Sequence, residues 1–274
     1  MSPERVDQPR EEPDVNRTEP DTLERTFPDI PTERLPKHIA FIMDGNGRWA
    51  RRRGLPRIEG HRRGVSTVRR LVEESARLGL AQITLYCLSS ENWKRPAHEL
   101  EFLMALLEQY LIEERQTLMA NDVRLKVIGR RDGIPENVLA EMDRTIEMSA
   151  GNRGTTLCLA INYGARAELV DAMRSIAAKV RDGEMSTDEI DESTIESSLA
   201  TRGMPDPDLM VRTAGEMRLS NFLLWQLSYA ELWVTEDCWP DFDLTHLHRA
   251  MRDFATRERK YGGLPDLAPE TAER

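Results

Sequence analysis

The sequence predicts an α/β protein: a single domain with a mostly parallel central sheet flanked by helices. Short apolar runs of strand length alternate along the chain with longer segments of helical pattern. Strands that alternate with helices are joined by right-handed crossovers, which set the strands parallel within one sheet. The first run, residues 38–43, is unbroken, as is typical of a parallel strand buried on both faces.

The expected elements follow one another in a regular order. Apolar runs predict strands at residues 38–43, 83–88, 123–128, 156–161 and 208–212, with a weaker one at 232–235. Helical patterns cover about 60–79, 98–120, 135–149, 165–181, 191–201 and 243–260. The segment Pro205-Asp206-Pro207 predicts a loop before the fifth strand. No apolar run reaches the ~20 residues of a membrane span, so no transmembrane segment is expected.

The helix expected at 98–120 carries a wide apolar face. Its members are Leu100, Phe102, Leu103, Met104, Leu106, Leu107, Tyr110 and Leu111. A face of this width is more often part of a core than the wall of a ligand site. It would line a tunnel only if the substrate were a long hydrocarbon.

Composition divides the chain into one folded domain, residues 37–263, and two tails. Residues 1–36 hold seven of the 15 prolines, none of the 16 glycines, ten acidic residues and five basic ones. Such a segment buries too little apolar surface to offset its ordering entropy, so we expect a disordered acidic tail. Residues 264–274 are expected to form a flexible C-terminal tail.

One segment is strongly basic although the chain has a net charge of −10. Between Asp44 and Arg70 there are nine arginines but only two acidic residues. A solvated helix face is the common explanation of a charge run, and a nucleic-acid patch is a second one. The acidic chain and the lack of a nucleic-acid motif argue against nucleic acid. A pocket for a small, multiply charged anion fits best, because the arginines lie beside a glycine-rich loop.

The cysteines indicate the compartment. Cys87, Cys158 and Cys238 are far apart, odd in number and form no C-x-x-C pair. Each lies in or beside an apolar stretch, which predicts buried free thiols in a reducing cytosol rather than disulfides or metal ligands. A cytoplasmic protein is therefore expected.

The segment with the most residues suited to ligand binding follows the first strand and reads Asp44-Gly45-Asn46-Gly47-Arg48. In open α/β sheets, ligands bind beyond the carboxyl ends of strands, where helix N-termini offer free N–H groups to anions. The glycines allow close approach of the backbone, Arg48 supplies charge, and Asp44 could hold a divalent cation. The segment predicts a site for a phosphate-bearing substrate and a metal ion.

Polar residues follow other strands as well. They are the segments 89–96, 162–164 and 213–220. Any one of them could be a helix cap or a turn. Because the carboxyl ends of parallel strands share one edge of the sheet, all of them would open onto the same site as Asp44, which capping alone does not explain.

Four motifs together resemble the cis-prenyltransferases, the undecaprenyl diphosphate synthase or isoprenyl transferase family. They are H-I-A-F-I-M-D-G-N-G-R-W-A at 38–50, S-S-E-N-W-K-R-P at 89–96, R-T-A-G-E at 212–216, and S-N-F-L-L-W-Q-L-S-Y-A-E at 220–231 followed by W-P-D-F at 239–242. The resemblance covers about residues 37 to 263. It implies a homodimer and a Mg²⁺-dependent reaction, in which isopentenyl diphosphate units extend an allylic diphosphate, commonly farnesyl diphosphate, with cis double bonds.

The resemblance also implies roles for individual residues. Asp44 would be the essential metal-binding carboxylate, with Glu231 as the second metal ligand. The allylic diphosphate would be surrounded by Gly45, Asn46, Gly47, Arg48, Arg57 and His61. The reacting centre would be lined by Ser89, Glu91, Asn92, Trp93 and Arg95. Isopentenyl diphosphate would be held by Arg212, Arg218 and Ser220, and further substrate contacts would come from Trp49, Ser90 and Leu219.

Two positions need comment beyond the roles that the resemblance implies. A carboxamide is a poor base near neutral pH, so Asn92 is expected to orient substrate or water while a diphosphate oxygen accepts the proton. Ala214 stands where the family has glycine in T-G-G-E, and its methyl group could matter if that position needs positive φ.

Other functions are weighed against this one. A trans-type prenyltransferase needs D-D-x-x-D motifs, and the chain has no Asp-Asp pair; a P-loop enzyme needs G-x-x-x-x-G-K-[ST], which is also missing. A non-catalytic partner or scaffold subunit with this fold stays open, as does a short-chain cis-prenyl diphosphate synthase. The favoured product is a long-chain polyprenyl diphosphate that serves as a lipid-carrier precursor for cell-wall synthesis, with peripheral membrane contact through the lipid.

Overall fold

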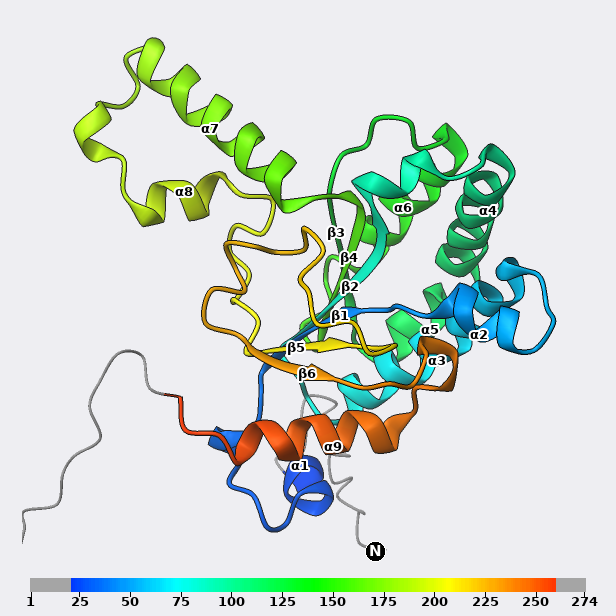
Figure 1. Cartoon of the computed structure of the whole chain (residues 1–274). Coiled ribbons are helices and arrows are strands. Elements are labelled where there is room, and N and C mark those ends of the chain that lie inside the picture. The colour runs from blue at the N-terminus through cyan, green and yellow to red at the C-terminus, as the bar shows by residue number, and fades with distance from the viewer. Residues whose placement is uncertain (1–20, 260–274) are drawn as a thin grey trace, which may run out of the picture.

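The computed structural model describes residues 21–259 and contains a six-stranded sheet in the order β3-β4-β2-β1-β5-β6 (Figure 1). All five strand pairings are parallel, which confirms the predicted α/β fold. The strands are β1 (His38–Ile42), β2 (Gln82–Ser89), β3 (Arg124–Ile128), β4 (Thr156–Tyr163), β5 (Leu209–Arg212) and β6 (Glu231–Val234).

Helices connect the strands and cover the sheet. They are α1 (Asp21–Thr26), α2 (Asn46–Arg52), α3 (Arg57–Arg77), α4 (Ala97–Glu113), α5 (Arg115–Ala120), α6 (Glu136–Ser149), α7 (Ala165–Arg181), α8 (Glu192–Ser198) and α9 (Leu244–Ala255). Figure 1 shows α7 and α8 extending away from the sheet, while α2, α3 and α4 gather at the opposite side of the molecule.

The central strand β1 is buried along its whole length, as its unbroken apolar run predicts. Alternate side chains belong to different clusters: Ile39 and Phe41 join the large core, and Ala40 and Ile42 join a smaller one around Phe222. Strand β1 also separates the two halves of the sheet, because the chain leaves it for β2 on one side and returns at β5 on the other. Such a switch point, at the carboxyl ends of the strands, is where α/β sheets bind ligands.

Residues 21–36 belong to the fold, so the expected disordered tail does not hold there. The ring of Phe27 is 1% exposed and meets the imidazole of His248 edge-on at 5.4 Å, and Arg252 binds the Asp29 carboxylate at 2.8 Å. Leu35 is buried as well. A few apolar side chains anchor a segment whose average composition is that of a tail. Residues 1–20 and 264–274 lie outside the described residues.

Two expected elements differ in detail. The helix predicted at 98–120 is interrupted at Glu114, where the buried carboxylate turns inward to the guanidinium of Arg69 on α3. Helix α2 begins where the first strand is expected to lead into a helix, but it is missing from the expected helical patterns because its seven residues carry no apolar periodicity. No helix among residues 21–259 has both the length and the apolar content to cross a bilayer.

Candidate active site

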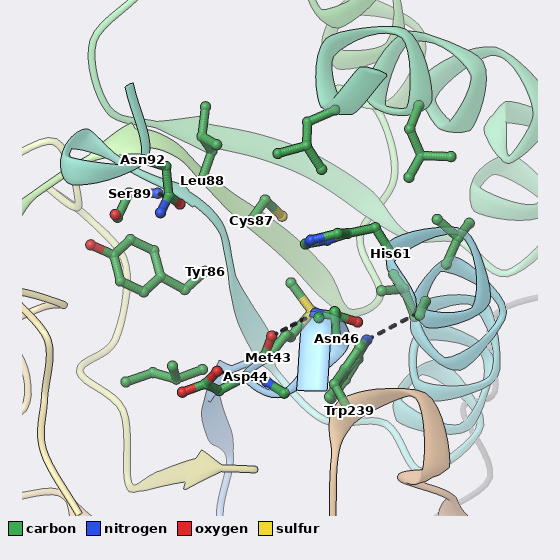
Figure 2. A pocket seen from close by; sticks show the side chains of 18 of the residues that line it. Met43, Asp44, Asn46, His61, Tyr86, Cys87, Leu88, Ser89, Asn92 and Trp239 are labelled. Carbon is green, nitrogen blue, oxygen red and sulfur yellow. Dashed lines mark hydrogen bonds between the residues drawn. The ribbon is translucent and has the colours of Figure 1, made fainter. Parts of the chain in front are cut away.

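A cavity of about 540 Å³ opens at the carboxyl ends of β1 and β2, between the sheet and helices α3 and α4 (Figure 2). Its polar lining consists of Asp44, Gly45, Asn46, Gly47, Arg48, Arg51, Arg57, His61, Ser89, Asn92, Arg95, Glu216 and Arg218. Its apolar lining includes Ile42, Met43, Val65, Val68, Tyr86, Cys87, Leu88, Leu103, Met104, Leu106, Leu107, Tyr110, Leu159, Ile161 and Trp239. The cavity therefore joins a charged region to a hydrocarbon-like one.

The polar region starts with the sharp turn that joins β1 to α2. Gly45 has φ +95°, and its N–H donates to the Asp44 carboxylate at 2.6 Å. A Cβ at this position would lie 2.8 Å from the methyl carbon of Ala214 and 2.9 Å from the Cys238 sulfur. Only glycine fits both the left-handed backbone and the close packing, and this turn fixes Asp44 at the cavity rim.

Asp44 is the centre of an ion-pair cluster. The guanidinium of Arg212, which is 3% exposed, donates to Asp44 Oδ2 at 3.0 Å, and Arg48 approaches the same oxygen at 3.3 Å. Burial alone would raise the pKa of Asp44, but hydrogen bonds from Arg212 and from the Gly45 N–H, with the charges of both arginines, hold the pKa below its usual value. Asp44 is therefore an anion at neutral pH, with 30% of its side chain exposed.

Glu216 is a second carboxylate at this rim, and the sequence reasoning did not assign it a role. It lies 3.5 Å from Arg48 and also binds Arg218, so carboxylates and guanidiniums alternate around the mouth. Its position in the R-T-A-G-E motif was the signal that could have identified it. Arg212 itself does not line the cavity. It supports the rim residues from the buried side, because its guanidinium donates to Ser220 Oγ at 2.7 Å and to the carbonyl oxygen of Arg218.

The loop after β5 holds several residues in left-handed conformations. Ala214 has φ 70°, and Ser220, Asn221 and Leu223 have φ values of 51°, 59° and 45°. The position where the family has glycine thus does require positive φ, and the alanine here carries that strain. Strain of this kind collects at functional sites, where the surrounding structure imposes it.

His61 and Asn46 present unpaired polar atoms. Among the described residues, buried His61 Nε2 and buried Asn46 Oδ1 have no hydrogen-bond partner. Burial, followed by the charge of Arg95, lowers the pKa of His61 to about 4, so its ring is neutral at physiological pH. In Figure 2 the ring points into the cavity from α3. A neutral imidazole and nearby Arg57 and Arg95 suit an anionic ligand.

Asn92 faces the cavity from the 3-10 helix η2 (Ser90–Lys94), which follows β2. Its side-chain oxygen accepts the N–H of Ser89 at 3.0 Å, which caps η2 and fixes the orientation of the carboxamide. Ser89 and Asn92 lie together above Tyr86 in Figure 2. With its oxygen engaged, the carboxamide has N–H groups to donate and no basic group to offer.

Several other predicted site residues support the cavity without lining it. The indole of Trp49 donates to Asp241 at 2.7 Å, the indole of Trp93 donates to Asn162, and Glu91 accepts from Asn221 at 2.8 Å. The further members of this group are Ser90, Leu219 and Ser220.

Glu231 is not brought to Asp44 within one chain. It is the first residue of β6, where the register pairs it with Leu209 at the amino end of β5, and it binds Arg257 at 2.6 Å. Arg212 is three residues further along β5, or about 10 Å. Glu231 precedes its apolar run, so strand-end reasoning never selected it, and the register agrees with that reasoning.

The prediction that all three cysteines are buried is wrong for Cys87. Cys158 and Cys238 are buried and free, but Cys87 is exposed to the cavity. A β-bulge between Tyr86 and Leu88 takes Cys87 out of the strand alternation and turns it to the apolar region (Figure 2). Desolvation of the sulfur, with a smaller effect of Cys158, raises the pKa of the Cys87 thiol to about 12.

The residues present suit Mg²⁺. Among residues 21–259, no group of three or more His, Cys, Asp or Glu side chains could enclose a metal ion. Mg²⁺ needs no such cage, because it binds through one or two carboxylates and fills its shell with phosphate oxygens and water. The ionised, partly exposed Asp44 carboxylate at the mouth of the cavity fits this mode.

Comparison with known proteins identifies the family. The Prenyltransf family model, described as undecaprenyl diphosphate synthase, matches residues 42–262. The chain belongs to the undecaprenyl diphosphate synthase family. This confirms the resemblance drawn from the four motifs, and the chain is therefore a prenyl transferase enzyme.

Individual relatives and solved structures support the same family assignment. An isoprenyl transferase of Rhodopirellula baltica is 57% identical over 84% of this chain and 94% of the relative, and one of Geobacter sulfurreducens is 47% identical over the same shares. The crystal structure of lavandulyl diphosphate synthase from Lavandula x intermedia in complex with dimethylallyl diphosphate is 37% identical, with a TM-score of 0.83 over 84% of this chain and 100% of that one. A probable undecaprenyl diphosphate synthase from Campylobacter jejuni is 32% identical, with a TM-score of 0.69 over 83% and 99%.

Proposed function

We propose that this enzyme elongates an allylic diphosphate by Mg²⁺-dependent cis condensation with isopentenyl diphosphate and releases a long-chain polyprenyl diphosphate. The single observation that carries the proposal is the two-part cavity, in which a rim of arginines and Asp44 is continuous with an apolar interior. The two parts correspond to the two parts of a prenyl diphosphate: a head of high negative charge and a hydrocarbon tail.

The rim residues bind and polarise the head groups. Arg48, Arg57 and Arg95 surround the position of the allylic diphosphate, together with neutral His61. Guanidinium groups match phosphate oxygens with two parallel hydrogen bonds and retain their charge throughout the reaction. As the allylic carbon–oxygen bond breaks, negative charge grows on the leaving diphosphate, and fixed positive groups stabilise that charge without reorganising.

Arg218 is the candidate for the second diphosphate, with Arg212 acting from beneath. Arg212 holds Asp44, Ser220 and the backbone of Arg218 in one network, so it sets the geometry of the isopentenyl site. Asp44 would hold Mg²⁺, which supplies additional positive charge at the diphosphate oxygens. Asn92, fixed by its cap on η2, donates hydrogen bonds that orient substrate or water, and a diphosphate oxygen accepts the proton released on condensation.

Chain growth is driven into the apolar interior. Each isoprene unit of five carbons gains up to about 4 kcal/mol on burial, at ~0.8 kcal/mol per carbon. Leu103, Leu106 and Leu107 of α4 and Val65 and Val68 of α3 line this interior. The product therefore extends between these helices until side chains block it. We propose that it is a lipid-carrier precursor for cell-wall synthesis.

We also propose that the enzyme is a cytoplasmic homodimer. Free cysteines favour a reducing compartment. Since Glu231 does not reach Asp44 in its own chain, a metal ion bound by both would require Glu231 from a second copy.

A short-chain product is the second candidate function. The observation that favours it is the 37% identity to a lavandulyl diphosphate synthase solved with dimethylallyl diphosphate. The 57% identity to an isoprenyl transferase favours the elongating enzyme. A non-catalytic scaffold is disfavoured, because Asp44, Arg48, Arg218 and Asn92 all line the cavity.

The decisive experiment supplies farnesyl diphosphate, labelled isopentenyl diphosphate and Mg²⁺ and sizes the products. We expect a long-chain product that disappears with EDTA. In Asp44→Asn, which keeps the size of the side chain, we expect turnover to fall at least 100-fold. Asp143→Asn, on the exposed surface of α6, is the matched control and should keep full activity. Undiminished synthesis by Asp44→Asn, or with EDTA, would contradict the metal assignment.

A further inference from the structure

The segment 51–57 comprises the last two residues of α2, the turn that follows and the first residue of α3; it is exposed along its length and strongly basic. We call it the basic turn. It contains Arg51, Arg52, Arg53, Leu55 and Arg57, and no acidic residue. In a chain of net charge −10, the sign of this surface is opposite to that of the whole protein. Figure 1 places the loop that joins α2 to α3 at the right edge of the molecule.

The geometry of the turn presents an apolar tip. Helix α2 ends at Arg52; two residues later Gly54 has a left-handed conformation, φ 68°, and the Leu55 N–H donates to the Ala50 carbonyl oxygen at 2.9 Å. This closure normally packs the following apolar residue against the helix. Leu55 is nevertheless 40% exposed, and a Cβ added to Gly54 would meet nothing within 4 Å.

The charge of the basic turn is only partly neutralised. Arg53 binds Asp241 at 3.3 Å, and Arg57 binds the buried Glu99 at 3.4 Å. Arg51 and Arg52 have no carboxylate partner among the described residues. The surface thus keeps at least two uncompensated positive charges beside an exposed leucine. Anionic headgroups over hydrocarbon complement such a surface.

The basic turn also lies at the mouth of the cavity. Arg51 and Arg57, at its two ends, belong to the cavity lining, and the Arg57 guanidinium lies 3.1 Å from the position of a Cβ on Gly47. A bilayer held at this turn would therefore face the opening of the site that holds an apolar chain.

We propose that the basic turn is a docking surface for a phospholipid bilayer that carries anionic headgroups. Leu55 enters the interface, and phosphates pair with Arg52, which has no carboxylate partner, and with Arg53, whose ion pair with Asp241 is exposed on both sides. This goes beyond the proposed function and does not depend on it, because binding to vesicles requires no turnover. Nucleic acid is the other polyanion that a basic surface could bind. The exposed apolar tip and the acidic remainder of the chain favour the bilayer.

The test is co-sedimentation of the full chain with vesicles of phosphatidylcholine alone or mixed with phosphatidylglycerol. We expect binding to the mixed vesicles only. In Arg52→Gln/Arg53→Gln/Leu55→Ser we expect the partition coefficient to fall about 30-fold from the two charges, with a further loss from the leucine. None of these three residues lines the cavity.

The control variant is Arg144→Gln/Arg174→Gln/Met173→Ser. It removes the same charge and a more exposed apolar side chain, 68% for Met173 against 40% for Leu55, from α6 and α7, and should bind like the wild type. Thermal melts verify that both variants fold. Raising the salt from 0.15 M to 1 M shortens the screening length from about 8 Å to about 3 Å, so wild-type binding should collapse without any substitution.

Three results would overturn the proposal: equal binding to neutral and anionic vesicles, equal loss in both variants, or binding to a short RNA without binding to vesicles. Loss of prenyl transfer with intact vesicle binding would instead count against the proposed function alone.

Discussion

Gly60 is the residue on which the position of the glycine-rich loop depends most directly. It lies in the first turn of α3, and a Cβ built there would be 2.0 Å from the backbone oxygen of Asn46 and 2.6 Å from its carbonyl carbon. One turn later, a Cβ on Gly64 would be 2.7 Å from Asn46 Oδ1. The two glycines let α3 pack directly on the start of α2, which carries Gly47 and Arg48.

The effect of Gly60→Ala follows from these distances. Ordinary contact begins at 3.4 Å, so the Asn46 backbone and α3 must separate by 1.4 Å. Overpacking of this kind costs about 1–3 kcal/mol, and the better helix propensity of alanine returns about 0.5–1 kcal/mol. A net loss of about 1 kcal/mol lowers Tm by about 2–4 °C. Displacing diphosphate-binding groups by more than 1 Å should lower kcat/KM about 100-fold.

The assay compares thermal melts and product formation from farnesyl diphosphate. Gly151→Ala is the matched control, since a Cβ there meets nothing within 4 Å and its φ is not positive. It should change neither stability nor activity. If Gly60→Ala keeps wild-type Tm and kcat/KM, close packing of α3 on Asn46 does not position the loop and the reasoning fails.

Three further predictions concern the interior. Burial lowers the pKa of His38 to about 4, so the folded ring is neutral while the unfolded chain takes up a proton below about pH 6.5. From pH 6.5 to pH 4, His38 alone should lower the free energy of unfolding by up to about 3 kcal/mol, and His61, whose pKa is also about 4, adds to that fall. In urea titrations His38→Gln should therefore show a shallower pH dependence of the free energy of unfolding than the wild type. Because the pKa of Cys87 is about 12, its alkylation by iodoacetamide at pH 8 should be slower than that of a free thiol on the order of 10³-fold. The alkylation rate, followed by mass spectrometry, should rise tenfold per pH unit. A rate that reaches a plateau below pH 9 would contradict this prediction. Leu107→Trp should fill the apolar interior and shorten the longest product, whereas Met173→Trp on the surface of α7 should not; an unchanged product size would show that the chain grows elsewhere.

Much of the fold could be predicted because buried parallel strands leave a recognisable apolar run in the sequence. Strand β1 is buried on both faces, and an unbroken apolar run is its direct consequence. The strand at 156–163 and the helix at 165–181 agree with expectation for the same reason, since each buries a face that its sequence must make apolar. The extent of helix α2 could not be predicted, because only Ala50 of its residues is buried and the helix therefore has no apolar period.

The candidate site was predictable in part. The turn after β1 concentrates Asp44, Gly45 and Arg48 in five residues, so its chemistry is local and visible. Gly60 has no comparable signal, because its importance lies in a contact with Asn46 from another helix. Cys87 turns toward the cavity through a bulge that no alternation pattern encodes.

The order of strands and helices, the acidic composition and the Asp44 loop at a strand end were set by the sequence alone, because burial and turn geometry act on neighbouring residues. The tertiary structure decided which distant groups meet: Arg212 under Asp44, Glu216 beside Arg48, and Glu231 at the far end of β6. It also decided that α3 and α4 leave an apolar space beneath a charged rim. Those outcomes depend on strand register and helix packing, which are collective properties of the whole fold and have no signature in any single segment.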